Sequence, residues 1–317
     1  MVTDDRYAQL LQRALRAFPG RQVGPVVEMA RSRAIIGPTN IPVSEAGAQR
    51  ALDQLQAGKV PAPADVAALE VLIRVMRPAP MSKAGELGRL DVAGAEQLFA
   101  PELLEEWDAF RKAVKPYLYS IGRIDLGVKG IGTGFLVAPD LLVTNRHVVS
   151  ILTSGTDLLA PGVASVAFHK EFGQPDPPGA TVAITAVVAV HPDLDMALLA
   201  VAAAGRPALP QALRAMVTGD RVVVVGYPQK DPERNPIFAE AVYNGRYGVK
   251  RAAVGEVIDA AGPVFWHDCS TLGGNSGSPV LRMADAQVVG LHFSGFFMYR
   301  NQAVGSDGLA KFVEAHQ

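Results

Sequence analysis

Three short segments of the chain contain the residue types of a serine nucleophile and its general base. His147 lies in TNRHVV, Asp195 begins DMALL, and Ser276 lies in GNSGSPV, in that order along the chain. A serine hydroxyl is a weak nucleophile near neutral pH, so a neutral imidazole must take its proton as the oxygen attacks a carbonyl carbon. A carboxylate then orients the imidazole and stabilises the imidazolium that forms. These three residues therefore predict acyl-transfer chemistry.

Each of the three residues also has a purely structural explanation. Asp195 could cap the end of a strand, and Asp193 stands two residues before it, while Ser276 could be an ordinary turn residue. The apolar run after Asp195 and the presence of all three motifs in order favour the catalytic interpretation. Glycines before Ser276 add to it, because glycine allows the backbone to aim N–H groups at a developing oxyanion.

The elements that must position these residues change in character near residue 117. Before it, apolar residues recur at helical spacing and predict helices from about residue 7 to Phe18, from a Ser44 cap to Gly58, and from about 63 to 78; another begins at Pro101. After it, β-branched runs separated by Gly, Pro, Asn and Asp predict short strands. These strands are expected at 134–137, 141–143, 181–190, 196–201, 221–225, 254–258 and 287–292, and a last helix at 308–315. Many short strands with regular turns are typical of a β-barrel or sandwich.

The order of the motifs, 48 and 81 residues apart, resembles the chymotrypsin-like (trypsin-like) serine peptidases over residues 117–317. The resemblance implies a mostly β fold of two six-stranded antiparallel β-barrels, preceded here by a small α-helical N-terminal domain. His147 and Asp195 would come from the first barrel and Ser276 from the second. The oxyanion hole would be the backbone N–H groups of Gly274 and Ser276. The expected organisation is a helical domain at 1–78, a linker and helix at 79–116, and a peptidase domain at 117–317 with barrels at about 117–205 and 213–300.

Substrate preference is suggested by a closer resemblance to bacterial glutamyl endopeptidases, carried by STLGGNSGSPV, VVVVGYP and GLHFSG. In that group a histidine and a hydroxyl bind an acidic P1 side chain, and a protonated histidine suits a carboxylate. The predicted S1 residues are Ser270, Thr271, His292, Ser294 and Gly295. Ser270 replaces the aspartate of trypsin-like enzymes, which argues against Arg or Lys at P1. Phe293 and Ser294 depart from the group, and the alternative is a core His292 beside a pocket for small or apolar side chains.

Activation by the trypsin route is not expected. An aspartate commonly precedes the serine in that family and pairs with a freed N-terminal amine, but this chain has the uncharged Asn275. The helical N-terminal domain could instead recruit a protein partner or regulate the peptidase, as in the cytosolic bacterial defence peptidases whose layout this chain resembles. It could equally be a prodomain or a packing extension of the barrels.

Composition restricts the other possibilities. Thirty basic residues face 31 acidic ones in 317, which gives no electrostatic reason to expect nucleic acid or an anionic membrane as a partner. The single cysteine, Cys269, excludes an intrachain disulfide, and the N-terminus lacks a signal peptide, so we expect a cytoplasmic bacterial enzyme. His267, Asp268 and Cys269 are too few for a structural zinc site.

These observations together predict a serine endopeptidase that acts on a protein or peptide substrate, with no metal and no cofactor. One alternative is a signalling or scaffold protein whose peptidase acts only after a partner drives assembly. Another is an esterase that uses the same three residues.

Overall fold

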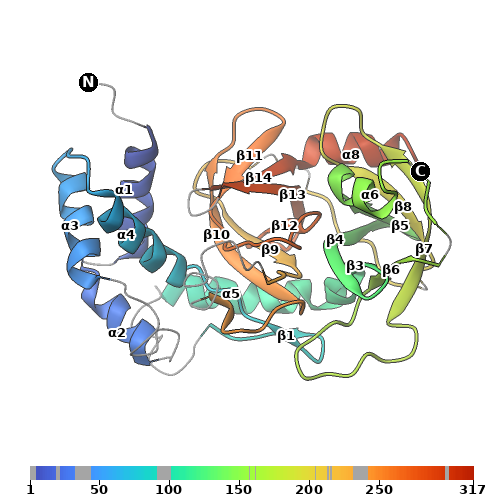
Figure 1. Cartoon of the computed structure of the whole chain (residues 1–317), viewed down its shortest axis with the longest axis horizontal. Helices are drawn as coiled ribbons and strands as arrows, with labels where there is room; N and C mark the ends of the chain where they lie inside the picture. Colours follow the sequence, from blue (N-terminus) through green and yellow to red (C-terminus); the bar gives the residue numbers. More distant parts are fainter. Residues whose placement is uncertain are drawn as a thin grey trace. The chain divides into compact units, whose positions relative to one another are not determined.

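The computed structural model describes residues 5–18, 22–32, 44–90 and 101–317, except 157, 161, 204, 213, 215, 231–241 and 297–299. The chain divides into two compact units, each described here by itself (Figure 1). The first unit comprises residues 1–78, 90–104 and 232–245. The second comprises residues 79–89, 105–231 and 246–317.

The first unit is built on helices, which are α1 (Asp5–Ala17), α2 (Gly24–Ser32), α3 (Glu45–Gln56) and α4 (Pro63–Val75). The side chain of Ser44 caps α3 by accepting a hydrogen bond from Gly47 N at 2.9 Å, and Gly58 leaves the helix with a φ of +67°. The prediction of α1, α3 and α4 is confirmed. The helix α2 was missed, because nine residues beginning with Gly-Pro are too few to establish a helical period.

The second unit begins with a hairpin of β1 (Ser82–Lys83) and β2 (Glu86–Leu87) in the stretch expected to be a linker. Residues 91–100 of that stretch lie outside the described residues. The helix α5 (Pro101–Val114) begins at the predicted proline, and the short 3₁₀ segment η2 (Lys115–Ser120) follows it. Proline at the first helical position costs no hydrogen bond, since that N–H has no partner in the helix.

Two closed antiparallel barrels make up most of this unit (Figure 1). Barrel 1 has the order β3-β4-β5-β8-β7-β6, with strands Ile121–Leu126, Lys129–Ala138, Leu141–Thr144, Ala164–Ala167, Thr181–Val190 and Ala197–Val201 for β3 to β8. Barrel 2 has the order β10-β11-β14-β13-β12-β9, with strands Arg221–Gly226, Arg251–Asp259, Val264–His267, Pro279–Arg282, Val288–Phe296 and Arg300–Gly305 for β9 to β14. The prediction of two six-stranded barrels after a helical region is confirmed.

Two helices accompany the barrels. The helix α6 (Arg146–Leu152) follows β5, and α8 (Ser306–Glu314) follows β14 near the end of the chain. The core of barrel 1 combines buried residues from its strands and from α6, among them Leu136, Leu142, Val148 and Leu199. Packing of α6 on this core fixes where the helix begins, and His147 is its second residue.

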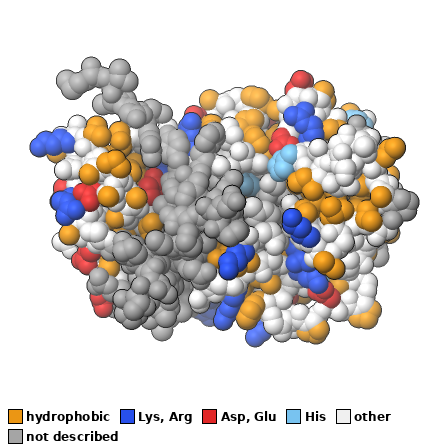
Figure 2. All heavy atoms as spheres, viewed as in Figure 1, with side chains coloured by type: hydrophobic (Ala, Val, Ile, Leu, Met, Phe, Trp, Pro, Cys, Tyr) orange, Lys and Arg blue, Asp and Glu red, His pale blue; other side chains and the backbone are white. Residues whose placement is uncertain are grey.

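Figure 2 shows apolar side chains distributed over the barrel 1 side of the viewed face among polar ones. Large exposed apolar residues in the part of the chain that forms barrel 1 and α6 are Val128, Ile151, Leu158, Val163 and Val188. Scattered apolar residues are normal on soluble surfaces. In the described part of the chain, none of the helices has the length and apolar character that crossing a membrane requires.

Candidate active site

His147 and Asp195 form a hydrogen-bonded pair at one end of barrel 1. The imidazole Nδ1 of His147 lies 2.6 Å from Oδ2 of Asp195, and the backbone N of His147 donates to Oδ1 at 3.0 Å. An ionised carboxylate only accepts hydrogen bonds, so Nδ1 carries the proton and Nε2 is left with a free lone pair. The His147 side chain is 43% exposed and that of Asp195 is 19% exposed, so the imidazole is accessible from solvent.

The carboxylate of Asp195 is held in its ionised form. Burial alone would raise the pKa of Asp195, but hydrogen bonds and charge from His147, with the nearby Arg146, together lower the pKa below its ordinary value. The side-chain amide of Asn145 donates to the carbonyl of Asp195 at 2.8 Å. The preceding turn is shaped by His191, whose Nδ1 accepts from the backbone N–H groups of Asp193 and Leu194.

Ser276 reaches this end of barrel 1 from the loop before β12. Its carbonyl accepts a hydrogen bond from Thr133 N in β4 at 2.8 Å. A Cβ built on Gly132 would lie 2.9 Å from Val148 and 3.3 Å from the carbonyl of Ser276. Val148 directly follows His147, so the segments that carry His147 and Ser276 both pack against Gly132. Within the described residues the Ser276 hydroxyl makes no hydrogen bond. Catalytic contacts are often long in the absence of substrate.

The loop before Ser276 leaves two backbone donors without acceptors. The carbonyl of Gly273 accepts from Gln229 N at 2.7 Å, and because the peptide bond is trans, the N–H of Gly274 points the opposite way. Among the residues that the structure describes, neither Gly274 N nor Ser276 N has a hydrogen-bond acceptor. Gly274 has a φ of +87°, and a Cβ there would lie 2.4 Å from Tyr227 O. Such a loop can stabilise an oxyanion.

The predicted S1 residues fall into two groups. In the first, the hydroxyl of Thr271 donates to Oδ1 of Asn301 at 2.9 Å, and a Cβ on Gly295 would lie 2.5 Å from that same oxygen. Asn301 in turn donates to the carbonyl of Cys269 at 2.6 Å. Ser270 is buried beside this group, while Ser294 is half-buried on β13 opposite Gln302.

His292 forms the second group together with His267, which we interpreted from the sequence as a structural residue. Nδ1 of His292 lies 3.2 Å from Nε2 of His267, and both rings are buried. Burial, with a smaller effect of charge on His147, lowers the pKa of His292 to about 3, so this imidazole is neutral near pH 7. In the free protein, His292 is therefore neutral and not protonated as the sequence analysis expected.

The S1 prediction did not include two residues that contact these S1 candidates, His267 and Asn301. His267 could have been found from the alternation in β11, where Phe265 and His267 are the buried residues. Asn301 had no comparable signal, because its contact with Thr271 depends on the pairing of β14 with β13. Polar residues on a strand do not by themselves indicate which neighbour they face.

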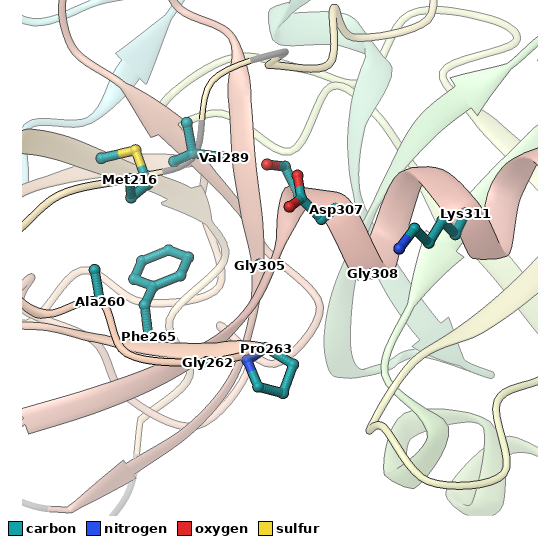
Figure 3. A pocket seen from close by; sticks show the side chains of 11 residues that line it. Met216, Ala260, Gly262, Pro263, Phe265, Val289, Gly305, Asp307, Gly308 and Lys311 are labelled. Carbon is teal, nitrogen blue, oxygen red and sulfur yellow. The ribbon is translucent and has the colours of Figure 1, made fainter.

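A separate cavity of about 320 Å³ lies beside the start of α8 (Figure 3). Phe265, Met216 and Val289 provide its apolar side, while Asp307 and Lys311 stand on the helix. None of the predicted triad, oxyanion-hole or S1 residues, all of which the structure describes, lines this cavity.

Comparison with known proteins identifies the family. A model of the trypsin-like peptidase domain matches residues 132–291, which include all three triad candidates. This chain belongs to the trypsin-like peptidase family. Two curated relatives of this trypsin-like peptidase domain, the serine proteases Rv3671c and MT3772 of two Mycobacterium tuberculosis strains, are 29% identical over 174 residues. The match covers 51% of this chain and 35% of each relative, so this chain spans about a third of their length.

Solved structures similar to this trypsin-like peptidase include Rv3671c from M. tuberculosis in its inactive form. It has 22% identity and a TM-score of 0.47, over 68% of this chain and 96% of that one. A serine endoprotease from Yersinia pestis has 18% identity and a TM-score of 0.45, over 65% of each chain.

Proposed function

We propose that this chain is a serine endopeptidase whose catalytic triad is His147, Asp195 and Ser276. The observation that carries the proposal is the pair of hydrogen bonds from His147 to Asp195, at 2.6 and 3.0 Å, in a chain of the trypsin-like peptidase family. The contact of Ser276 with β4 supports it, since β4 pairs with β5, the strand that leads to His147.

The reaction has two proton-coupled steps. Oγ of Ser276 attacks the peptide carbonyl carbon while Nε2 of His147 takes the hydroxyl proton, and the N–H groups of Gly274 and Ser276 stabilise the oxyanion. The imidazolium then gives its proton to the leaving amine, and the acyl-enzyme forms. Water repeats the sequence on the ester, with His147 again as the base, and releases the acid. These steps need no metal or organic cofactor.

We further propose a preference for Glu or Asp at P1. Within the described residues Nε2 of His292 has no hydrogen-bond partner, while Nδ1 faces His267, so a ligand can use this nitrogen. A neutral imidazole paired through Nδ1 can donate from Nε2 to a carboxylate. The absence of a charge at Ser270 fits the same ligand, and the hydroxyl of Thr271 would donate to it by exchanging its hydrogen bond to Oδ1 of Asn301. The likeness to glutamyl endopeptidases supports this preference and is part of the proposal.

Acidic P1 binding should take up a proton. A bound carboxylate favours the imidazolium, so the pKa of His292 in the complex lies above its value of about 3 in the free protein. Affinity for a Glu peptide therefore rises as the pH falls from the pKa of His292 in the complex to about 4.3, where the Glu side chain itself takes up a proton, and affinity for a Gln peptide lacks this component. Measuring binding to the inactive Ser276→Ala variant separates this effect from catalysis.

The helical unit has a proposed role of its own. We infer that it binds a protein partner and so selects or regulates the substrate of the peptidase. Its fold as a compact unit distinct from the barrels supports this role. The cytoplasmic location predicted from the sequence stays a prediction.

The test is a panel of peptide reporters that differ only at P1, with Glu, Asp, Gln, Arg, Phe and Ala. Wild type should cleave the Glu reporter best, Ser276→Ala should cleave none, and His292→Ala should lose about tenfold or more of the Glu-over-Gln preference. The matched control is His316→Ala, which removes an exposed histidine and should leave the Glu-over-Gln preference unchanged.

The panel separates the two parts of the proposal. Ser276-dependent cleavage of Phe or Ala reporters alone would retain the endopeptidase and contradict the acidic pocket. Cleavage of simple esters without any amide reporter would replace the endopeptidase by an esterase. Cleavage that survives Ser276→Ala would contradict the triad itself.

A further inference from the structure

One residue of barrel 1 makes three hydrogen bonds to the strand and loop segments that surround Ser276. Thr133, fully buried in β4, donates its backbone N–H to the carbonyl of Ser276 at 2.8 Å and its hydroxyl to the carbonyl of Gly274 at 2.7 Å. The same hydroxyl accepts from Tyr227 N at 3.2 Å. Thr133 therefore joins the oxyanion loop, here residues 272–276, to both barrels.

The oxyanion loop has every carbonyl oriented by a hydrogen bond. Leu272 O accepts from Asn275 N, Gly273 O from Gln229 N, and Asn275 O from Ser278 N. The remaining two, Gly274 O and Ser276 O, are the ones that Thr133 holds. Each bonded carbonyl fixes one peptide plane, so Thr133 holds the 274–275 and 276–277 planes. These two planes alternate with the 273–274 and 275–276 planes, which carry the free N–H groups of Gly274 and Ser276. Together these hydrogen bonds hold the loop in the conformation that presents the free N–H groups of Gly274 and Ser276.

The residues around Thr133 make this contact possible. A Cβ on Gly132 would meet Val148 at 2.9 Å and the carbonyl of Ser276, and a Cβ on Gly134 would meet Leu142 at 2.5 Å. Glycine at 132 lets β4 pass close to the oxyanion loop, so that the short threonine side chain reaches it, and glycine at 134 lets β4 pack closely on Leu142 of β5. The hydroxyl of Thr144, at the end of β5, donates to Thr133 O at 2.7 Å and so fixes the backbone of β4 at this residue.

We propose that Thr133 is a positioning residue that keeps the oxyanion hole formed without an ion pair. Asn275 carries no charge, and its side-chain amide donates only to Leu272 O, at 3.3 Å, among the described residues. Neutral hydrogen bonds from Thr133 hold the oxyanion loop in place of a buried salt bridge between an aspartate and an N-terminal amine. The inference rests on the proposed peptidase function, and it implies that the site needs no proteolytic activation.

The experiment compares Thr133→Val, which keeps the shape of the side chain and removes the hydroxyl, with Thr133→Ser, which keeps the hydroxyl. With a peptide reporter that wild type cleaves, kcat should fall by about 10–100-fold in Thr133→Val, while KM changes less than about twofold. Thr133→Ser should retain most of the wild-type kcat. Thr153→Val removes another buried hydroxyl bonded to a backbone carbonyl, and it should leave kcat unchanged.

A second readout does not depend on activity. Hydrogen–deuterium exchange of peptides covering residues 272–278 should accelerate in Thr133→Val and stay at the wild-type rate in Thr133→Ser and Thr153→Val. If Thr133→Val does not fold, Thr133→Ala takes its place in both measurements. Wild-type kcat or unchanged exchange in the hydroxyl-free variant would overturn the inference. If wild type shows no Ser276-dependent cleavage, the proposed function is rejected instead. The exchange data would then still test whether Thr133 holds the oxyanion loop.

Discussion

At the scale of single residues, the site is organised around one carboxylate that accepts two hydrogen bonds from one neighbour. Asp195 binds both the backbone N–H and the imidazole of His147, so the ring is fixed in position and in tautomer. The backbone bond ties the carboxylate to the first turn of α6. In the proposed mechanism, catalysis by this pair therefore depends on the start of α6 as much as on the two side chains.

Replacing Asp195 by asparagine should reduce kcat by about 10³–10⁴-fold with little change in KM. The amide oxygen can still accept from the backbone N–H of His147, but the amide group then donates to Nδ1 and moves the imidazole proton to Nε2. Without a free Nε2 lone pair, the ring cannot take the Ser276 proton. Steady-state kinetics with a peptide reporter measures the loss.

The matched control is Asp193→Asn, which changes an exposed carboxylate two residues away. It should keep nearly wild-type kcat, since Asp193 interacts with His191 through its backbone N–H. Equal losses in the two variants would contradict the assigned role of Asp195.

The candidate site was predictable from the sequence to the extent that its residues sit in local motifs. His147, Asp195 and Ser276 each lie in a short segment whose neighbours indicate their chemistry. Thr133 and His267 do not, because their roles come from contacts across barrels and strands. Thr133 meets Gly274 across a separation of 141 residues, a pairing that no local pattern contains.

At the scale of elements, the helical unit is held together by a buried ion pair as well as by apolar packing. Arg13 of α1 and Glu70 of α4 form two parallel hydrogen bonds of 3.1 Å, and their side chains are 1% and 4% exposed. Bidentate geometry offsets much of the desolvation cost of the two charges. The pair fixes how α1 lies against α4.

Removing either partner should be strongly destabilising. Arg13→Met or Glu70→Met leaves an uncompensated buried charge, and we expect a loss of about 3–5 kcal/mol in the free energy of unfolding of the helical unit. Urea unfolding of the full chain, followed by helical circular dichroism, measures it. The double variant should be more stable than either single variant, because it leaves no buried charge.

Arg50→Met provides the control, since Arg50 pairs with Asp65 at the surface, where solvent screens the charges and the pair adds little stability. Single variants of the buried pair that unfold at the same urea concentration as Arg50→Met would contradict this account of the helical unit.

Helices and strands were not equally predictable, for a physical reason. A helix such as α3 carries its period within a few turns, so α1, α3 and α4 were visible in the sequence. Strands β6, β12 and β14 were not expected, because ASVA, PVLR and RNQAVG lack a run of β-branched residues. Hydrogen bonds from two neighbouring strands in a closed barrel hold such segments whatever their propensity.

At the scale of the whole molecule, a buried lysine joins segments that are distant in the sequence. Lys250 precedes β10, and its ammonium group donates to the carbonyls of Leu118 and Phe168, which flank barrel 1. Burial lowers the pKa of Lys250 to about 7, although the charge of Glu171 raises it and that of Arg206 lowers it further. The connection between the barrels therefore carries a titratable group.

The stability of the protein should depend on pH through this lysine. Between about pH 7 and 10.5 the unfolded chain holds a proton on Lys250 that the folded chain has released, so raising the pH favours folding. The contribution is at most about 1.4 kcal/mol per pH unit. Free energies of unfolding from pH 6 to 9 should therefore rise less steeply in Lys250→Met than in wild type.

Lys112→Met serves as the control, because Lys112 is an exposed residue of α5. Its unfolding free energy should follow the wild-type pH profile. Parallel profiles for Lys250→Met and wild type would show that Lys250 does not titrate in this range and would contradict its assigned role at the barrel junction.

The central claim is that Ser276 is a nucleophile activated by His147, and covalent labelling tests it most directly. The full chain is treated with a fluorophosphonate probe, and the modified residue is identified by mass spectrometry in wild type, Ser276→Ala and His147→Ala. We predict one probe per chain on Ser276 in wild type and no label in either variant. Labelling of a different serine, or an unlabelled wild type that is folded, would contradict the claim.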